Sequence, residues 1–432
     1  MFINHLNEKC QFAVLLMVLV CSISPLLAAQ KPNVIIIFTD DQGSIDMNIY
    51  GSTDLVTPNM DQLAREGIRF TQFYATGPVC VPSRVGLMTG RMPQHGGLYG
   101  SVPLGSQVFI SQEMKKAGYA TAHIGKWHLA HGKNALPNDK GFDDSFGHHD
   151  GCIDNYSHYF YWNGPNRHDL WRNGQEVFYN GEFFPDLMVK EASDFMEKNK
   201  DKPFFLYFAM NAPHYPYQGT PKWLQHYSDL KYPRNLYAAF ISTMDERIGQ
   251  LLKKLEDLGL RKNTIVIFQS DQGHSTEDRA HGGGGSSGPY RGCKFTLYEG
   301  GLRVPAIISW PGHLPQNQVR SQMATGSDWY PTILELCKLP AAKHRIDGKS
   351  LLPILTDAEA PSAHESLYWR QNNDWAVRQG KWKLIVSDKK TELYDIPNDL
   401  GEANNLATGH PEVVTELKNL GKDYREQSIL YK

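Results

Sequence analysis

Several continuous runs of apolar residues predict strands that are buried on both faces. Residues 33–38 read Asn-Val-Ile-Ile-Ile-Phe, residues 204–209 read Phe-Phe-Leu-Tyr-Phe-Ala, and residues 264–268 read Thr-Ile-Val-Ile-Phe. These runs lack the polar–apolar alternation of a strand that exposes one face, and they are rich in β-branched and aromatic side chains. We therefore expect the three segments to be central strands of a sheet.

Segments of helical periodicity lie between these runs. Residues 58–67 form one such segment, with Thr57 as the expected N-cap, Pro58 in the first turn and Gly67 as the stop signal. Residues 236–258 carry apolar side chains at helical spacing and predict a longer helix. Strands that alternate with helices indicate an α/β fold, with a large and mostly parallel sheet sandwiched by helices.

The last part of the chain follows a different pattern. Short apolar and aromatic segments are separated by turn residues, which predicts a small antiparallel sheet closed by a helix over residues 411–425. A chain of 432 residues is too long for one compact core. Because Asp, Ala, Pro and Ser cluster over residues 356–363, we expect a catalytic domain over residues 30–358 and a C-terminal subdomain over residues 359–432. The four strands predicted in the subdomain are residues 365–369, 375–378, 382–386 and 392–394.

The first 30 residues have the composition of a secretory signal peptide. A lysine precedes an apolar run over residues 12–20, and Ala28 and Ala29 offer a small-residue cleavage site. The run is shorter than the roughly 20 residues of a spanning helix, so a membrane anchor is less favoured. Lipoprotein attachment at Cys21 is weaker still, because a bulky valine precedes it. We predict that residues 1–29 are a signal peptide and that the mature protein is secreted or periplasmic, with no membrane span.

Charge and cysteine content argue against several classes of protein. The 44 basic side chains nearly balance the 46 acidic ones, for a formal net charge of −2, so no basic excess favours nucleic-acid binding. Four of the six cysteines lie beyond the signal segment, scattered and without C-x-x-C spacing. This pattern is neither a disulfide framework nor a zinc knuckle. The four are Cys80, Cys152, Cys293 and Cys337.

Acidic and amide side chains follow two of the predicted strands. Asp40 and Asp41 come directly after the first strand, and Asp271 and Gln272 follow the strand over residues 264–268. Ligands of an open parallel sheet bind beyond the carboxyl ends of its strands, so neighbouring strands would bring these oxygens together. Oxygen ligands alone favour a hard divalent cation, calcium before magnesium. The alternative is that either pair caps a following helix.

Cys80 is expected at the start of a helix. Pro82 follows two residues later and a helical pattern continues from there, so the helix dipole and free amide groups would favour an anion near Cys80. Arg84 adds a fixed positive charge one turn further along. Two alternatives stay open: a small buried cysteine, or a nucleophilic thiolate.

Five sequence motifs occur in order between about residue 32 and about residue 400. The chain has Cys-Val-Pro-Ser-Arg at 80–84 with Thr-Gly-Arg at 89–91, and Gly-Lys-Trp-His-Leu at 125–129. Ala-Pro-His-Tyr-Pro follows at 212–216, and a long segment from Tyr290 to Pro305 precedes Trp-Pro-Gly at 310–312. Together these motifs resemble the type I sulfatase family of the alkaline phosphatase superfamily. The resemblance implies an alkaline phosphatase-like fold and sulfate ester hydrolysis by a formylglycine made from Cys80.

The resemblance also implies roles for particular residues. Asp40, Asp41, Asp271, Gln272 and modified Cys80 would bind Ca²⁺, and a formylglycine-generating enzyme would be the modifying partner. Arg84 and Lys126 would hold the formylglycine and the sulfate. His128 would be the base, and His214 and Lys294 would grip the sulfate and assist the leaving oxygen. One position departs from the family, which usually has Asn where this chain has Gln272.

Residues between the motifs are expected to set substrate specificity. His149, Asp150, Arg279 and His281 are candidate substrate contacts, and an aromatic stretch over residues 156–162 suits sugar rings. We expect a sulfated polysaccharide or glycosaminoglycan as substrate, without preference for one sugar, one sulfate position, or exo or endo action. Two rivals are a phosphonate or phosphodiester hydrolase of the same superfamily, and a catalytically silent glycan-binding protein.

Overall fold

A computed structural model of the chain describes residues 31–95, 104–130, 132–162 and 164–429. The predicted signal peptide, residues 1–29, lies outside these ranges. Among the described residues, no helix is both long enough and apolar enough to cross a membrane.

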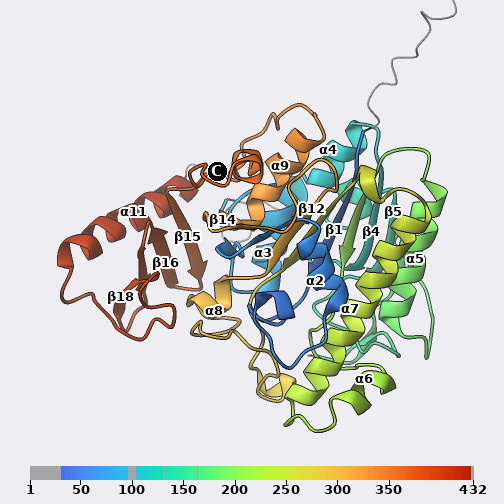
Figure 1. The fold of residues 1–432 in the computed structure, drawn as a ribbon, viewed down its shortest axis with the longest axis horizontal. Helices are drawn as coiled ribbons and strands as arrows, with labels where there is room; N and C mark the ends of the chain where they lie inside the picture. Colours follow the sequence, from blue (N-terminus) through green and yellow to red (C-terminus); the bar gives the residue numbers. More distant parts are fainter. Residues whose placement is uncertain (1–30, 96–103, 131, 163, 430–432) are drawn as a thin grey trace, which may run out of the picture. The chain divides into compact units, whose positions relative to one another are not determined.

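Ten strands in the described residues form one large sheet, in the order β13-β2-β12-β11-β1-β10-β4-β5-β8-β9 (Figure 1). The five strands from β11 to β5 are mutually parallel, and β12 and β8 on either side run antiparallel to them. The predicted α/β fold with a mostly parallel sheet is thus confirmed. The strands are β1 Asn33–Thr39, β2 Ile68–Phe70, β4 Ala120–Lys126, β5 Asp144–His148, β8 Trp171–Arg172, β9 Gln175–Glu176, β10 Phe204–Ala209, β11 Thr264–Ser270, β12 Ala306–Ser309 and β13 Gln318–Arg320.

The three predicted central strands are β1, β10 and β11, and they are immediate neighbours. All their residues are buried, as expected for apolar runs covered on both faces. Thr39 at the end of β1 pairs in register with Ser270 at the end of β11. The residues that follow each strand, Asp40 and Asp271, therefore emerge side by side at one edge of the sheet.

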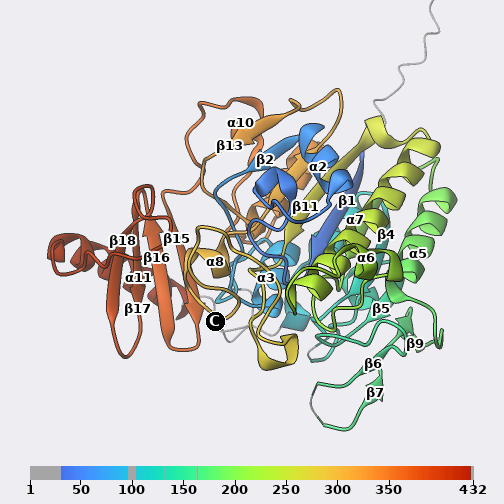
Figure 2. The ribbon, with the colours of Figure 1, turned by 60° about the horizontal axis from the view of Figure 1, so that its bottom comes forward.

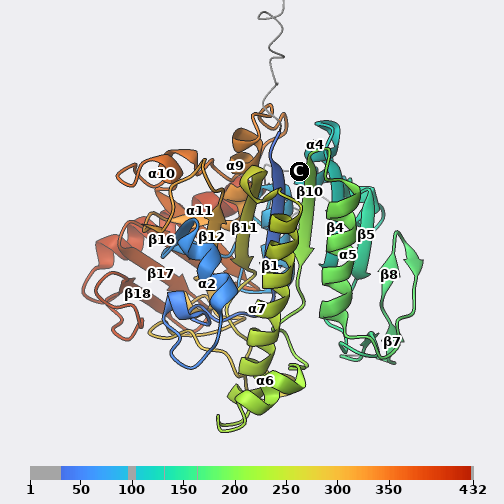
Figure 3. The ribbon, with the colours of Figure 1, turned by 45° about the vertical axis from the view of Figure 1, so that its right-hand side comes forward.

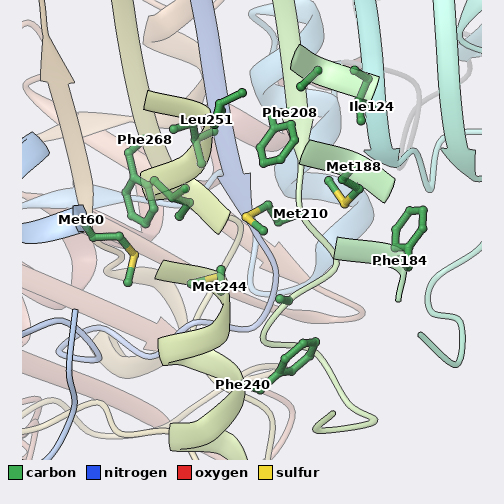
Figure 4. Packing of buried hydrophobic residues seen from close by; sticks show 14 of the residues in the cluster. Met60, Ile124, Phe184, Met188, Phe208, Met210, Phe240, Met244, Leu251 and Phe268 are labelled. Carbon is green, nitrogen blue, oxygen red and sulfur yellow. The ribbon is translucent and has the colours of Figure 1, made fainter. Parts of the chain in front are cut away.

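Helices cover both faces of the sheet (Figure 3). On one face, α2, α5 and α7 pack onto alternate residues of β1 such as Ile35 and Ile37, and Figure 4 shows Met188 of α5 and Met244 of α7 in this layer. On the other face, α3, α4, α9 and α10 pack onto Val34, Ile36 and neighbours. The helices are α2 Pro58–Arg65, α3 Cys80–Thr89, α4 Ile110–Lys116, α5 Phe184–Lys198, α6 Pro221–His226, α7 Arg234–Asp257, α8 Glu299–Leu302, α9 Trp329–Leu336 and α10 Leu352–Thr356. Short 3-10 helices lie at Asn48–Tyr50, Leu104–Ser106, Asn138–Lys140, Arg261–Asn263, Asp278–Ala280 and Gly326–Asp328.

The start of helix α2 differs in detail from the prediction. Thr57 occupies the N-cap position, but its side chain makes no capping hydrogen bond to the helix. Instead the Asp245 carboxylate of α7 accepts the backbone N–H groups of Asn59 (3.2 Å) and Met60 (2.8 Å). Thr57 is hydrogen-bonded to Asn48, so a residue distant in sequence has taken over its expected role.

The C-terminal part forms the predicted antiparallel sheet, with strands in the order β15-β16-β17-β18 and a long helix, α11. Hydrogen bonds join this small sheet to the rest of the fold. In one of them, the Trp369 indole N–H donates to the Ala75 carbonyl (2.8 Å). The elements are β15 Ser366–Gln371, β16 Asp374–Gln379, β17 Trp382–Val386, β18 Thr391–Asp395 and α11 Pro411–Ile429. The division into domains at residue 358 stays a prediction.

Two further two-stranded sheets complete the fold. One pairs β3 Phe73–Tyr74 with β14 Ala324–Thr325, and the other pairs β6 Tyr159–Phe160 with β7 Arg167–His168. Figure 2 shows the β6–β7 ribbon beside β9, in the segment between β5 and α5. The aromatic stretch predicted to contact sugars lies in this segment.

Candidate active site

Two pairs of side chains, Asp40 with Asp41 and Asp271 with Gln272, meet where β1 and β11 end. Asp40, Asp41, Asp271 and Gln272 are all buried, with at most 1% of their surface exposed. One oxygen of the Asp271 carboxylate accepts the backbone N–H of Asp41 (3.0 Å) and of Gln272 (2.9 Å). The Gln272 amide nitrogen donates to Asp41 Oδ1. The expected convergence at this edge of the sheet therefore occurs.

Cys80 is the first residue of α3, as its sequence context predicted. Its Sγ lies 3.4 Å from Asp40 Oδ1, and the thiol is 5% exposed. Ser83, one turn further along, donates its hydroxyl to the Asp271 carbonyl and so fixes the helix start against the end of β11. The start of the helix therefore places Cys80 beside the carboxylates.

Two lysines and a histidine complete the cluster from three other segments. Lys126, the last residue of β4, donates to Asp40 Oδ2. Lys294 lies 2.9 Å from each Asp41 oxygen and 3.4 Å from His214 Nε2. His214 Nδ1 lies 2.7 Å from the Tyr215 carbonyl, so the proton sits on Nδ1 and the neutral ring accepts from Lys294 through Nε2.

Arg84 lies beneath the carboxylates with none of its surface exposed. Its Nη1 donates to the Lys126 carbonyl and to the Tyr207 hydroxyl, both at 3.1 Å. Its Nη2 lies 3.8 Å from Asp40 Oδ2 and 3.5 Å from Asp271 Oδ2. Arg84 therefore braces the acidic cluster from the interior of the protein.

The carboxyl groups compete for positive charge. Burial would raise the pKa of Asp40, but the charge of Lys126 leads the opposing effects and holds that pKa well below its ordinary value. Burial raises the pKa of Asp41 to about 6 even beside Lys294. Burial and the charge on Asp40 raise the pKa of Asp271 well above its ordinary value. A bound cation would favour the ionised form of all three buried carboxyl groups.

The cluster fits a divalent cation. The ligand atoms of Asp40, Asp41, Cys80 and His214 lie within 4.8 Å of one another. Asp271 Oδ2 and Gln272 Oε1 are buried and accept no hydrogen bond, which is costly for polar atoms. Carboxylate and amide oxygens are the ligands that Ca²⁺ prefers. The residues present thus fit a calcium ion.

His128 is half-buried at the border of this cluster and has a left-handed backbone (φ 55°). A Cβ placed on Gly151 would meet His128 Nε2 at 3.1 Å and the Trp162 ring at 3.3 Å. A β-carbon at position 151 would crowd both side chains, so glycine favours the close approach of the loop after β5 to His128. This contact brings the aromatic segment next to the buried cluster.

The four predicted substrate contacts have different neighbours. His149 stacks on Trp171 at 5.2 Å, and Asp150 pairs with Arg167 at 2.5 Å. The Arg279 guanidinium lies 3.3 Å above the Trp162 ring and 5.1 Å from the Tyr215 ring, beside His214. His281 packs on Tyr232 at 5.2 Å. Among the described residues, Arg279 is thus the one of the four that contacts Tyr215, the residue directly after His214.

Comparison with known proteins identifies the chain. Residues 32–339 match the family model described as Sulfatase, and residues 292–427 match N-sulphoglucosamine sulphohydrolase, C-terminal. The chain belongs to the sulfatase family. It is a sulfuric ester hydrolase with a type I sulfatase fold.

Relatives of this sulfatase align over nearly all of it. N-acetylgalactosamine-6-sulfatase of Mus musculus is 35% identical over 95% of this chain and 85% of that protein. N-acetylgalactosamine-6-O-sulfatase of Bacteroides thetaiotaomicron is 30% identical over 91% of this chain and 93% of that protein. The crystal structure of Ps i-CgsB in complex with k-i-k-neocarrahexaose has 29% identity and a TM-score of 0.82, covering 92% of this chain and 93% of that one.

Several residues of this sulfatase site were not predicted from the sequence. Glu277 lies 3.8 Å from Lys294 and binds Arg279, and Tyr207 in the middle of β10 binds Arg84. Tyr237 of α7 donates to Asp46 (2.8 Å) and accepts the backbone N–H of Gly43 (3.1 Å), which supports the loop after Asp41. A tyrosine in an apolar run carries no local signal of such a role, because only the packing of distant segments creates it.

Proposed function

We propose that this sulfatase hydrolyses sulfate esters of carbohydrates through a formylglycine made from Cys80, with Ca²⁺ bound by Asp40, Asp41, residue 80, Asp271 and Gln272. The observation that carries the proposal is the buried cluster in which three carboxyl groups, Cys80 and two lysines converge. Two buried oxygens that accept no hydrogen bond, Asp271 Oδ2 and Gln272 Oε1, support a cation there.

The state of Cys80 supports modification rather than direct attack by sulfur. Burial and the nearby Asp40 charge raise the pKa of the Cys80 thiol well above its ordinary value. The thiol is therefore protonated near neutral pH, and a protonated thiol is a poor nucleophile. After conversion to an aldehyde, a hydrate at residue 80 would offer two hydroxyl groups in place of the thiol.

The surrounding residues have complementary tasks. When bound, Ca²⁺ and hydrated formylglycine supply positive charge and a hydroxyl nucleophile. Lys126 and Lys294 hold the oxygens of the sulfate in a site with little water, where charge counts most. Lys294 and neutral His214, 3.4 Å apart, together assist the departing alcohol oxygen. His128, half-buried at the border, acts as the base that restores the resting residue.

A sulfated carbohydrate is the substrate class we favour. The relatives that this chain resembles include N-acetylgalactosamine-6-sulfatases, and one similar structure holds a neocarrahexaose. Trp162 is 41% exposed beside His128, and exposed aromatic rings suit the apolar faces of sugars. We propose a secreted or periplasmic location, because a polymeric sulfated glycan lies outside the cytoplasm.

The decisive test joins mass spectrometry with turnover. In protein from a host with the modifying enzyme, we expect the peptide that contains Cys80 to carry an aldehyde, while the peptide that contains Cys337 keeps its thiol as an internal control. The same preparation should release sulfate from N-acetylgalactosamine 6-sulfate or a sulfated glycan, and Cys80→Ala should lower that rate at least about a thousandfold. An unmodified Cys80 in active protein would exclude the formylglycine route, and faster release of phosphate from phosphodiesters would favour the rival hydrolase.

A further inference from the structure

Phe295 follows Lys294 in a tight turn over residues 293–296. The turn is closed by the hydrogen bond from the Thr296 N–H to the Cys293 carbonyl (3.0 Å), and Thr296 Oγ1 accepts the Cys293 N–H (3.1 Å). Phe295 is its third residue and has φ 70°. That position in a type II turn requires a left-handed backbone, which glycine or asparagine normally supplies.

A bulky aromatic residue is disfavoured in this conformation. Its Cβ approaches the backbone too closely, so the surroundings must hold it there. Here the Phe295 N–H donates to the Pro78 carbonyl (2.9 Å), two residues before Cys80. This bond, like the turn itself, uses only backbone atoms of residue 295, so glycine would serve both. The fold therefore does not require the ring.

The Phe295 ring takes no part in the core. It is 43% exposed, and the four hydrophobic clusters of the described residues do not include it. The neighbouring Lys294 side chain points inward and is 4% exposed. The turn thus sends Lys294 into the acidic cluster and leaves the Phe295 ring on the surface directly beside it.

The distance between the two side chains indicates what the ring can reach. Lys294 Nζ lies 5.5 Å from the centroid of the Phe295 ring. A sulfate oxygen bound to that ammonium at about 3 Å would bring the esterified carbon of the substrate into the space beside the ring. A pyranose presents C–H groups on one face, and aromatic rings pack against such apolar surfaces.

We propose that Phe295 is a specificity-determining residue whose ring packs against the apolar face of the sugar that carries the sulfate ester. This inference rests on the proposed function, in which Lys294 binds the sulfate. On this proposal, the protein keeps an unfavourable backbone conformation at residue 295, where the turn favours glycine, because the aromatic ring contacts the substrate.

The test separates sugar binding from sulfate binding. With N-acetylgalactosamine 6-sulfate as substrate, Phe295→Gly should raise KM about fivefold to tenfold with kcat nearly unchanged, and Phe295→Tyr should keep the wild-type KM. Inorganic sulfate used as a competitive inhibitor should bind both variants as it binds wild type, since Lys294 is untouched. The melting temperature of Phe295→Gly should be unchanged or higher, because glycine tolerates φ 70°.

A matched control tests the backbone effect alone. Lys338 is exposed and also has a left-handed backbone (φ 54°), so Lys338→Gly should relax a similar strain without any change in KM. An unchanged KM in Phe295→Gly, with wild-type protein active, would overturn the inference and leave the proposed function standing. Equal weakening of inorganic sulfate and sugar sulfate would overturn it too, because the ring would then act through Lys294. A wild-type protein with aldehyde at Cys80 but no turnover of any sulfated sugar would overturn both.

Discussion

At the scale of single residues, Gln272 is where this chain departs from the family pattern, and the structure gives the departure a geometry. The longer side chain reaches across to Asp41 and donates its amide N–H there, while its oxygen stays buried without a donor. An asparagine has the same amide on a shorter arm. The difference concerns where the oxygen lies, and the number of available oxygens is the same for both residues.

We expect Gln272→Ala to weaken calcium binding at least about tenfold, because it removes an oxygen ligand and leaves Asp41 without its amide partner. Gln272→Asn should retain binding, since it keeps an amide oxygen. Isothermal titration of chelator-treated protein with calcium measures both, and the rise in melting temperature with added calcium gives a second readout. Wild-type affinity in Gln272→Ala would remove Gln272 from the ligand set.

At the scale of elements, the pairing of α2 with α7 depends on one buried acid. Asp245 of α7 accepts the Asn59 and Met60 N–H groups at the start of α2, and the Asn59 side chain donates to it as well (2.7 Å). Burial raises the pKa of Asp245 to about 6 despite these bonds. Its ionised form is thus less well accommodated in the folded protein than in the unfolded chain.

This pKa predicts a pH dependence of stability with a definite sign. The pKa of Asp245 is higher in the folded protein than in the unfolded chain. The stability that protonated Asp245 contributes is therefore complete below about pH 4 and is lost as the pH rises through about 6. The loss is about 3 kcal/mol. Asp245→Asn should not show this loss. Its free energy of unfolding should therefore rise relative to that of the wild type as the pH increases from about 4 to about 6. Urea unfolding at several pH values measures the difference, and parallel profiles for the two proteins would contradict the prediction.

The sequence predicted the elements whose own residues determine them. The runs of β1, β10 and β11 are apolar throughout because both faces are covered, and this is visible locally. Two-residue strands such as β8 and β9 escaped prediction, because their pairing is decided by partners rather than composition. Lys126, His214 and Lys294 were identified by family resemblance alone, since a lone lysine or histidine in a sequence does not reveal what it will face.

At the scale of the whole molecule, buried charges join the C-terminal sheet to the segment that carries Lys294. Lys383 of β17 lies 3.0 Å from Glu299 of α8 and 2.9 Å from Glu402, and all three side chains are fully buried. Glu402 also accepts the Glu299 N–H (2.7 Å). Gly301, two residues after Glu299, accepts the Gly273 N–H (3.1 Å) next to Gln272. The C-terminal sheet thus supports the acidic cluster through α8.

Removing the central cation of this group should therefore affect both stability and the distant site. Lys383→Met removes the cation 2.9 Å from the buried Glu402 carboxylate, while Glu299 keeps Arg303 at 3.0 Å, and we expect a cost of about 3–5 kcal/mol in the free energy of unfolding. Lys381→Met is the matched control: its ion pair with Asp395 is half-exposed, so its loss should cost less than about 1 kcal/mol. Adding Glu402→Gln to Lys383→Met should recover part of the stability, because one uncompensated charge disappears. Urea unfolding measures these free energies. Calcium titration of the same variants tests whether calcium binding near Gln272 is weakened as well. Equal losses of stability for the two lysine variants would show that the buried group contributes no more than a surface ion pair.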